Sequence, residues 1–127
     1  MKPIRYLTAT EVARISEREI GPNLLAAFNL LESAVLRPQT TVGGHDAYPD
    51  LHTKAAAMFH SLVRNHPFID GNKRTGVLAI AVFYTLNDHE LIDDTEAIIS
   101  LAVDTAEGLL TVDAIAGRLK SMVREQA

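Results

Sequence analysis

The stretch from Thr75 to Leu86 is apolar at almost every position, and it constrains the fold more than any other part of the chain. A helix on a protein surface needs a polar side, so a helix without one belongs in an interior. The stretch is also too short to cross a bilayer, which takes about 20 apolar residues. We therefore expect residues 75–86 to form the central helix of a compact helical bundle with no membrane association.

Composition narrows the class of protein further. The chain has 127 residues, 47% of them hydrophobic, no cysteine and a formal net charge of -4. Without cysteine, disulfides, thiolate metal sites and cysteine nucleophiles are excluded. The acidic balance argues against direct binding of nucleic acid, which needs a basic surface. We expect a single domain over residues 1–127 and, because residues 1–10 show no signal-peptide pattern, a cytoplasmic location.

Capping residues mark most of the expected helices. Thr8 and Glu11 have the spacing of a capping box at the start of the first helix, which should end at Gly21 and Pro22. Capping side chains also precede the apolar patterns of three later helices: Asp50, Asp94 and Thr111. With the helix over residues 75–86, these signals give five helices of an all-α fold of about six.

The second helix carries no capping side chain, and its limits come from two prolines. Pro22 suits a first helical turn, and the apolar residues that follow at three- and four-residue steps begin with Leu24 and Leu25, so the helix should run from Pro22 to just before Pro38. At the other end of the chain, the same spacing places Val123 on the apolar face of the sixth helix.

Residues 37–49 interrupt the helical pattern before the third helix. This segment contains two prolines, two adjacent glycines and polar or β-branched residues between them. It should form an extended surface loop or a small hairpin. A loop of this length can be a plain connector, but such loops often carry function.

The chemistry concentrates between the third and fourth helices. The window from Arg64 to Arg74 carries three basic residues and one acidic residue, a local charge of +2 in an acidic chain. Positive side chains at the start of a helix, where amide groups lack partners, form a typical phosphate site. Gly71 allows close approach of the backbone, and Asn72, Lys73 and Arg74 can hold the anion. This window therefore predicts a phosphate-binding site at the start of the fourth helix.

Two further side chains, Asp70 and His66, indicate which reaction this site could catalyse. Asp70 would repel phosphate unless a cation lay between them, so it is a candidate Mg²⁺ ligand, and magnesium ATP is the simplest ligand. His66 changes protonation near neutral pH and can take a proton from an attacking hydroxyl. The structural alternative is that His66 and Asp70 only cap helices, Gly71 makes a turn, and Lys73 and Arg74 are solvated charges.

Read as one string, His66 to Arg74 resembles the signature of the Fic family, His-x-Phe-x-(Asp/Glu)-Gly-Asn-x-Arg. The likeness covers most of the chain and is greatest to the Doc branch, the death-on-curing toxins of toxin–antitoxin pairs. It implies a Fic-like helical bundle with a flap at residues 37–49 that pairs with an extended segment of a target protein. It also implies a catalytic His66, Mg²⁺ on Asp70, and ATP phosphates held by residues 71–74.

Two positions depart from the signature of Fic enzymes that transfer AMP. Those enzymes usually have a glycine where this chain has Lys73, and a second arginine where it has Val77. The Doc-like proteins share the departure, and the likeness then implies an ATP-dependent enzyme that phosphorylates a hydroxyl of elongation factor Tu and blocks translation. The alternatives are a Fic-type adenylyltransferase and a non-catalytic helical binding module.

The resemblance also bears on regulation. Many Fic proteins carry an inhibitory helix with the pattern Ser/Thr-x-x-x-Glu-Gly/Asn, whose glutamate pairs with the second arginine. The nearest match, Ser121 to Gln126, lacks the last residue of the pattern, and Val77 replaces the partner arginine. The resemblance therefore implies inhibition in trans by a cognate antitoxin of the small DNA-binding type.

Overall fold

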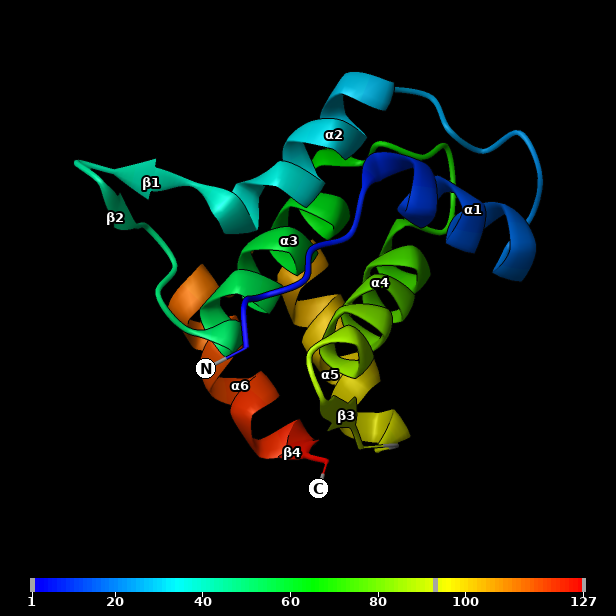
Figure 1. Ribbon diagram of the computed structural model, residues 1–127. Helices are drawn as coiled ribbons and strands as arrows, with labels where there is room; N and C mark the ends of the chain where they lie inside the picture. The colour runs from blue at the N-terminus through cyan, green and yellow to red at the C-terminus, as the bar shows by residue number, and fades with distance from the viewer. Residues whose placement is uncertain (1, 93, 127) are drawn as a thin grey trace.

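The structure is a computed structural model that describes residues 2–92 and 94–126; Met1, Asp93 and Ala127 lie outside the described residues. The described residues form six α-helices, one 3₁₀ helix and four short strands (Figure 1). In chain order these elements are α1 (Ala9–Glu19), α2 (Phe28–Leu36), η1 (Arg37–Gln39), β1 (Thr41–Val42), β2 (His45–Asp46), α3 (Leu51–Asn65), α4 (Asn72–Leu86), β3 (His89–Leu91), α5 (Thr95–Ala106), α6 (Val112–Met122) and β4 (Val123–Glu125). None of the described helices is both long and apolar enough to span a membrane.

The helix starts follow the capping signals of the sequence. Thr8 and Glu11 form a complete capping box at α1, and the Asp50 side chain accepts a hydrogen bond from the backbone of Thr53 at α3. Asp94 and Thr111 cap α5 and α6 in the same way. The structure confirms these four predictions. An N-cap depends only on residues within one turn of each other, so the local sequence is enough to predict it.

The second helix differs from its prediction. It begins at Phe28 instead of Pro22, and residues 24–27 lie extended beside the segment that precedes α4. The amides of Ala26 and Ala27 donate to the carbonyl of Pro67 at 2.9 and 3.0 Å. Leu25 forms a bridge to Phe68 and is not part of a helical face. Pairing with a distant segment has overridden the local helical pattern.

The all-α expectation is also incomplete, because two small antiparallel sheets are present. β1 pairs with β2 in the hairpin that was one of two options for residues 37–49. β3 pairs with β4 and joins the end of α4 to the C-terminal segment, so Val123 faces Leu91 in a strand instead of extending α6. Three-residue strands leave no periodic signal that distinguishes them from a helix end.

The core centres on α3 more than on α4. α3 packs against α2, α4, α5 and α6, and its buried residues run without interruption from Lys54 to Phe59. α4 buries only one side, and Val82 remains 36% exposed. Gly76 allows the two helices to approach closely, since a Cβ there would lie 3.1 Å from Val63 Cγ2. The close contact of α3 and α4 fixes the loop that connects them.

Candidate functional site

The loop from His66 to Gly71 turns the chain from α3 into α4. α3 ends at Asn65, and His66 adopts a left-handed conformation with φ 50° and ψ 59°. Pro67 disfavours helical backbone at the residue before it, which explains the abrupt end. His66 is therefore the C-cap residue of α3 through its backbone, and its side chain is exposed at the start of the loop.

Contacts on both sides of the loop hold it in one shape. The amide of Ile69 donates to the carbonyl of Leu24 at 2.7 Å, which continues the pairing with the segment before α2. The ring of Phe68 is 3% exposed and belongs to the core. The Asn72 side chain closes the turn, since its Oδ1 accepts from the Phe68 amide at 3.0 Å and its Nδ2 donates to the Phe68 carbonyl at 2.8 Å. The loop is a built structure with defined partners.

Asn72 also contacts His66. The Nδ2 atom of Asn72 lies 3.4 Å from Nδ1 of the imidazole, a long hydrogen bond. The structure thus gives Asn72 a role that the spacing alone did not reveal: its side chain shapes the loop and orients His66, and its backbone N–H remains at the start of α4.

The first turn of α4 presents its amide groups without a side-chain cap. Gly71 is the N-cap residue, with φ 77° and ψ 20°, and it makes no side-chain capping bond. A Cβ on Gly71 would lie 2.8 Å from Cγ2 of Ile20, at the end of α1. Both the left-handed backbone and the contact with α1 require glycine here. The first-turn N–H groups have no intrahelical partners and carry the positive end of the helix dipole.

Three charged side chains surround this helix start. Lys73 and Arg74 are exposed, and neither takes part in the ion pairs found among the described residues. Asp70 is exposed, and its Oδ1 accepts from the backbone amide of Gly71 at 2.8 Å. Asp70 therefore shapes the turn before the helix and does not cap α4. The predicted residues 66 and 70–74 all lie within this loop and the first turn that follows it.

The donor set fits one class of metal ion. Among residues 2–92 and 94–126, no three His, Asp or Glu side chains gather into a cage for a metal. A lone carboxylate is the usual protein contribution to Mg²⁺ that takes its other ligands from phosphate oxygens and water. Asp70, one residue before the N-cap of α4, fits that pattern and does not fit a structural metal site.

Arg64, the first cation of the basic window, has a structural role. Its Nη1 donates to the carbonyl of Ala106 at 2.6 Å, at the C-terminal end of α5. Its guanidinium also packs against Gly108, where a Cβ would lie 3.2 Å from Nη2. The cation satisfies a free carbonyl and the negative end of a helix dipole. Arg64 thus joins α3 to α5, and among the described residues it forms no ion pair.

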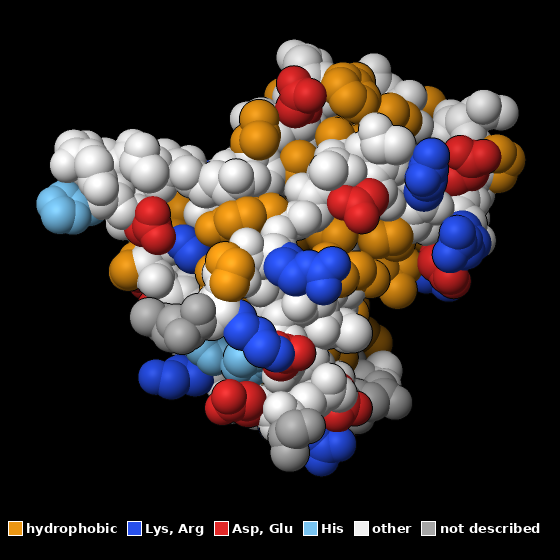
Figure 2. Space-filling view, in the orientation of Figure 1, with side chains coloured by type: hydrophobic (Ala, Val, Ile, Leu, Met, Phe, Trp, Pro, Cys, Tyr) orange, Lys and Arg blue, Asp and Glu red, His pale blue; other side chains and the backbone are white. Residues whose placement is uncertain are grey.

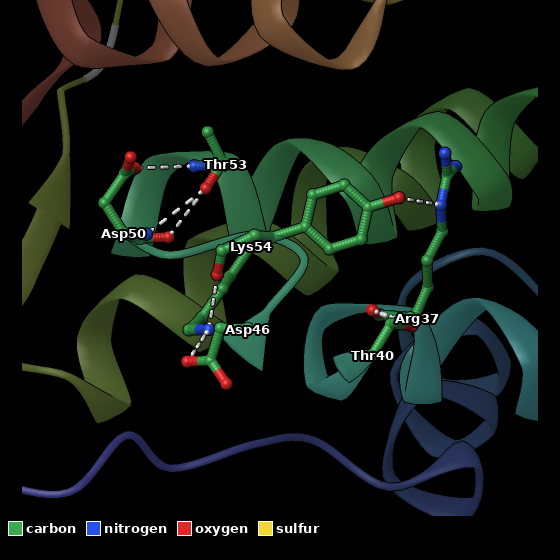
Figure 3. A network of polar contacts seen from close by, with 7 residues as sticks. Arg37, Thr40, Asp46, Asp50, Thr53 and Lys54 are labelled. Atoms are coloured by element: carbon green, nitrogen blue, oxygen red, sulfur yellow. Dashed lines mark hydrogen bonds and ion pairs between the residues drawn. The ribbon is translucent and has the colours of Figure 1, made fainter. Parts of the chain in front are cut away.

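The flap at residues 37–49 is anchored at its base and exposed at its tip. Arg37 Nε donates to the Tyr48 hydroxyl at 2.9 Å, and its guanidinium lies 5.6 Å from the centroid of that ring. Lys54 is 2% exposed, donates to the Tyr48 carbonyl at 2.5 Å and pairs with Asp46 at 3.2 Å (Figure 3). The hairpin itself projects clear of the body (Figure 2), and Val42 is 68% exposed. Lys54 lies among the apolar residues of α3, and no local sequence pattern marks it as the anchor of this segment.

The flap begins beside the second half of α3, where Arg37 donates to Ser61 Oγ at 2.9 Å, and the chain returns from the flap to the first turn of α3 (Figure 1). α3 has 15 residues, which gives a length of about 22 Å at a rise of about 1.5 Å per residue. α2 packs against α3 and connects the segment beside the loop of His66 to the start of the flap; Phe28 and Leu36 of α2 are 50% and 53% exposed. The outer edges of β1 and β2 have no strand partner among the described residues. Free strand edges of this kind can pair with an extended segment of another chain.

Comparison of the sequence with known proteins gives two matches that cover this part of the chain. The family model described as the Fic/DOC family matches residues 5–84, which include the flap, α3, the loop and most of α4. A protein named Toxin Doc from Mycolicibacterium smegmatis is 42% identical over 106 residues. That alignment covers 83% of this chain and 77% of the relative. Both matches span the residues that form the candidate site.

Proposed function

Because the chain belongs to the Fic/DOC family, we propose that it is a Doc-like toxin of a toxin–antitoxin system that transfers phosphate from ATP to a hydroxyl of a target protein. The observation that carries the proposal is one arrangement of side chains. An oriented imidazole, His66, lies beside a helix start whose amides are uncapped and whose cations, Lys73 and Arg74, pair with no carboxylate among the described residues.

Each residue of this arrangement has a definite task in phosphate transfer. The first-turn amides of α4, with Lys73 and Arg74, bind the phosphate chain and offset the charge that develops on it. His66 takes the proton of the target hydroxyl as its oxygen attacks the γ-phosphorus. The bond between that phosphorus and the bridging oxygen to the β-phosphate breaks, and ADP leaves. Asp70 would hold Mg²⁺, which when bound neutralises charge on the phosphate oxygens.

Lys73 and Val77 favour transfer of the terminal phosphate over transfer of AMP. Lys73 is exposed on the first turn of α4, so a long cation stands where Fic enzymes that transfer AMP usually have glycine. One turn later Val77 is apolar and half-buried, so the helix offers no second arginine to clamp a phosphate chain. A single cationic turn suits the end of a phosphate chain better than its middle.

We place the target at the flap and the antitoxin in trans. An extended segment of the target can add to a free edge of the β1–β2 hairpin and run along α2 toward His66, and elongation factor Tu is the proposed target. An inhibitory helix within the chain is unsupported, because Arg124 and Glu125 of the sequence match lie in strand β4. A cognate antitoxin of the small DNA-binding type is therefore the proposed inhibitor, and the cytoplasm is the proposed location.

Labelled ATP tests the reaction directly. The purified protein is incubated with elongation factor Tu, Mg²⁺ and ATP labelled at either the γ- or the α-phosphate. The proposal expects label on the target from γ-labelled ATP only, released as phosphothreonine or phosphoserine after acid hydrolysis. Label retained from α-labelled ATP would replace the proposal with AMP transfer.

His66→Ala separates a catalytic protein from a binding module. The variant should keep the thermal midpoint of the wild type, because the His66 side chain is exposed, and should retain Mg·ATP binding. It should lose both labelling of the target and toxicity in growing cells, since the proton acceptor is gone. A His66→Ala variant that is as toxic as the wild type would show that the fold acts by binding alone.

A further inference from the structure

A shallow channel runs along one face of α2 to the base of the flap. Its volume is about 400 Å³. The residues that line it are Asn29, Glu32, Ser33 and Leu36 from α2, Arg37 from η1, and Thr40, which precedes β1. The four residues of α2 stand at positions i, i+3, i+4 and i+7, so they share one side of the helix. We call this feature the α2 channel.

One end of the α2 channel lies beside the loop of His66. The amide of Ala27 donates to the carbonyl of Pro67 at 3.0 Å, just before α2 begins. Asn29 follows closely after this contact with the loop. From Asn29 to Leu36 the channel runs for about 10 Å along the helix, at about 1.5 Å per residue. An extended peptide covers that length in about three residues, at about 3.3 Å each.

The other end of the α2 channel lies at the free edge of β1. The carbonyl of Thr40 accepts from the amide of Ala47 at 2.8 Å, so this carbonyl faces the returning strand of the flap. Successive residues of a strand direct their main-chain groups to opposite edges, so the N–H and C=O of Thr41 face outward. A target segment that pairs with this edge therefore lies next to the channel.

Glu32 gives the middle of the α2 channel a negative charge. Its side chain is exposed, and none of the ion pairs in the described part of the chain includes it. Asn29 and Ser33 add oxygen atoms that can accept hydrogen bonds. Leu36, one turn after Glu32, is 53% exposed and offers an apolar surface. This set matches a long basic side chain, which has a hydrocarbon stem and a cationic head.

Arg37 also lines the α2 channel, but its guanidinium is held by the flap and by α3. Nε donates to the Tyr48 hydroxyl at 2.9 Å, and Nη1 donates to Ser61 Oγ at 2.9 Å. Thr40 Oγ1 donates to the carbonyl of Arg37 at 2.7 Å and fixes the flap end of the channel (Figure 3). Glu32 is therefore the charge in the channel that lacks an ion-pair partner among the described residues.

We propose that the α2 channel is a subsite for the target and binds a Lys or Arg side chain, with Glu32 as its counter-ion, an inference that rests on the function proposed above. The length of the channel places this basic residue within about four residues of the hydroxyl that accepts the phosphate. An acidic side chain at the same position would face the Glu32 carboxylate and be rejected. Glu32 thus determines specificity for the target and takes no part in the transfer of phosphate.

Steady-state labelling with γ-labelled ATP tests the role of Glu32. We expect Glu32→Gln to raise the KM for elongation factor Tu about three- to fivefold, the effect of an exposed ion pair, with kcat and Mg·ATP affinity unchanged. Glu32→Lys should raise the KM more than about tenfold, because like charges then meet, and Glu32→Asp should stay close to the wild type. Glu96→Gln is the matched control, since Glu96 is an exposed glutamate on α5, outside the channel. Equal KM values for the wild type and Glu32→Gln would overturn the subsite and leave the proposed function standing.

Variants of the target test the other side of the pair. Mass spectrometry locates the labelled hydroxyl, and each Lys or Arg within about four residues of it is changed to Gln. One of these changes should raise the KM about three- to fivefold for the wild type and less than about twofold for Glu32→Gln. A labelled hydroxyl without a basic residue in that range, or effects that simply add to that of Glu32→Gln, would overturn the proposal. No labelling by the wild type would refute the proposed function and the subsite with it.

Discussion

Gly71→Ala is the substitution that most directly tests how the site is built. Gly71 adopts φ 77° at the N-cap of α4, a conformation that costs a residue with a Cβ about 1–2 kcal/mol. The new Cβ would also lie 2.8 Å from Cγ2 and 3.0 Å from Cδ1 of Ile20. Overpacking of this kind typically costs about 1–3 kcal/mol. The two effects together predict a loss of about 2–5 kcal/mol in the free energy of unfolding.

A double-mutant cycle with Ile20→Ala separates the two contributions. Removing the Ile20 side chain beyond Cβ leaves its nearest atom 3.7 Å from the new methyl group, an ordinary contact. In that background Gly71→Ala should cost only the backbone contribution, about 1–2 kcal/mol. The coupling energy between the two sites should therefore be about 1–3 kcal/mol.

Urea unfolding followed by circular dichroism measures the free energy of unfolding of the wild type, the two single variants and the double variant. Gly43→Ala is the matched control. Gly43 also has a positive φ, 59°, but no atom lies within 4 Å of the Cβ position, so only the backbone contribution should appear. The reasoning fails if Gly71→Ala costs no more than Gly43→Ala, or if it costs the same with and without the Ile20 side chain. Because Gly71 is the N-cap residue of α4, the single variant should also lose affinity for Mg·ATP.

Three further predictions concern residues outside the loop. Lys54→Met should raise hydrogen exchange of the flap amides about 10- to 100-fold, because one charged hydrogen bond is worth about 1.5–3 kcal/mol; an unchanged flap would refute its anchoring role. Arg64→Ala should lower the free energy of unfolding by about 1 kcal/mol without changing Mg·ATP affinity, and weaker nucleotide binding would return Arg64 to the site. Burial is the main cause that lowers the pKa of His52, whose Nδ1 lies 2.9 Å from the Tyr84 hydroxyl, so the unfolded chain binds this proton more readily. The free energy of unfolding of the wild type should therefore decrease as the pH drops below about 6.5, and its excess over that of the His52→Gln variant should shrink. A difference between the two proteins that stays constant from pH 7.5 to 5.5 would contradict this.

Local signals in the sequence predict four of the helix starts correctly. The errors arise where a segment pairs with a distant part of the chain. The starts of α1, α3, α5 and α6 follow from single capping side chains, since a cap is settled within one turn. The predicted start of α2 is wrong because residues 24–27 pair with the segment before α4, which lies 40 or more positions later in the chain. The strand formed by Val123 was missed for the same reason: its partner, Leu91, is far away in the chain.

In the candidate site too, local features follow from the sequence and contacts between distant segments do not. The spacing of His66 to Arg74 predicted which residues gather at the helix start, because they are neighbours in sequence. It could not predict that the Asn72 side chain closes the loop, since that depends on the turn geometry of Phe68. Nor could it predict the partner of Arg64, a carbonyl on α5 at position 106.

The loop of His66 and the flap, which the proposed reaction assigns to ATP and to the target protein, are held in place to different degrees. The loop of His66 is fixed from three directions: by Ile20 against Gly71, by the segment before α2, and by the Asn72 side chain. A loop so constrained needs no rearrangement to bind phosphate, so its cost of ordering is already met in folding. The flap is fixed only at its base, by Lys54 and Arg37, and its strand edges are free. Adaptation on binding should therefore be confined to the side that meets the target, and the geometry of the donor site should be the same with or without it.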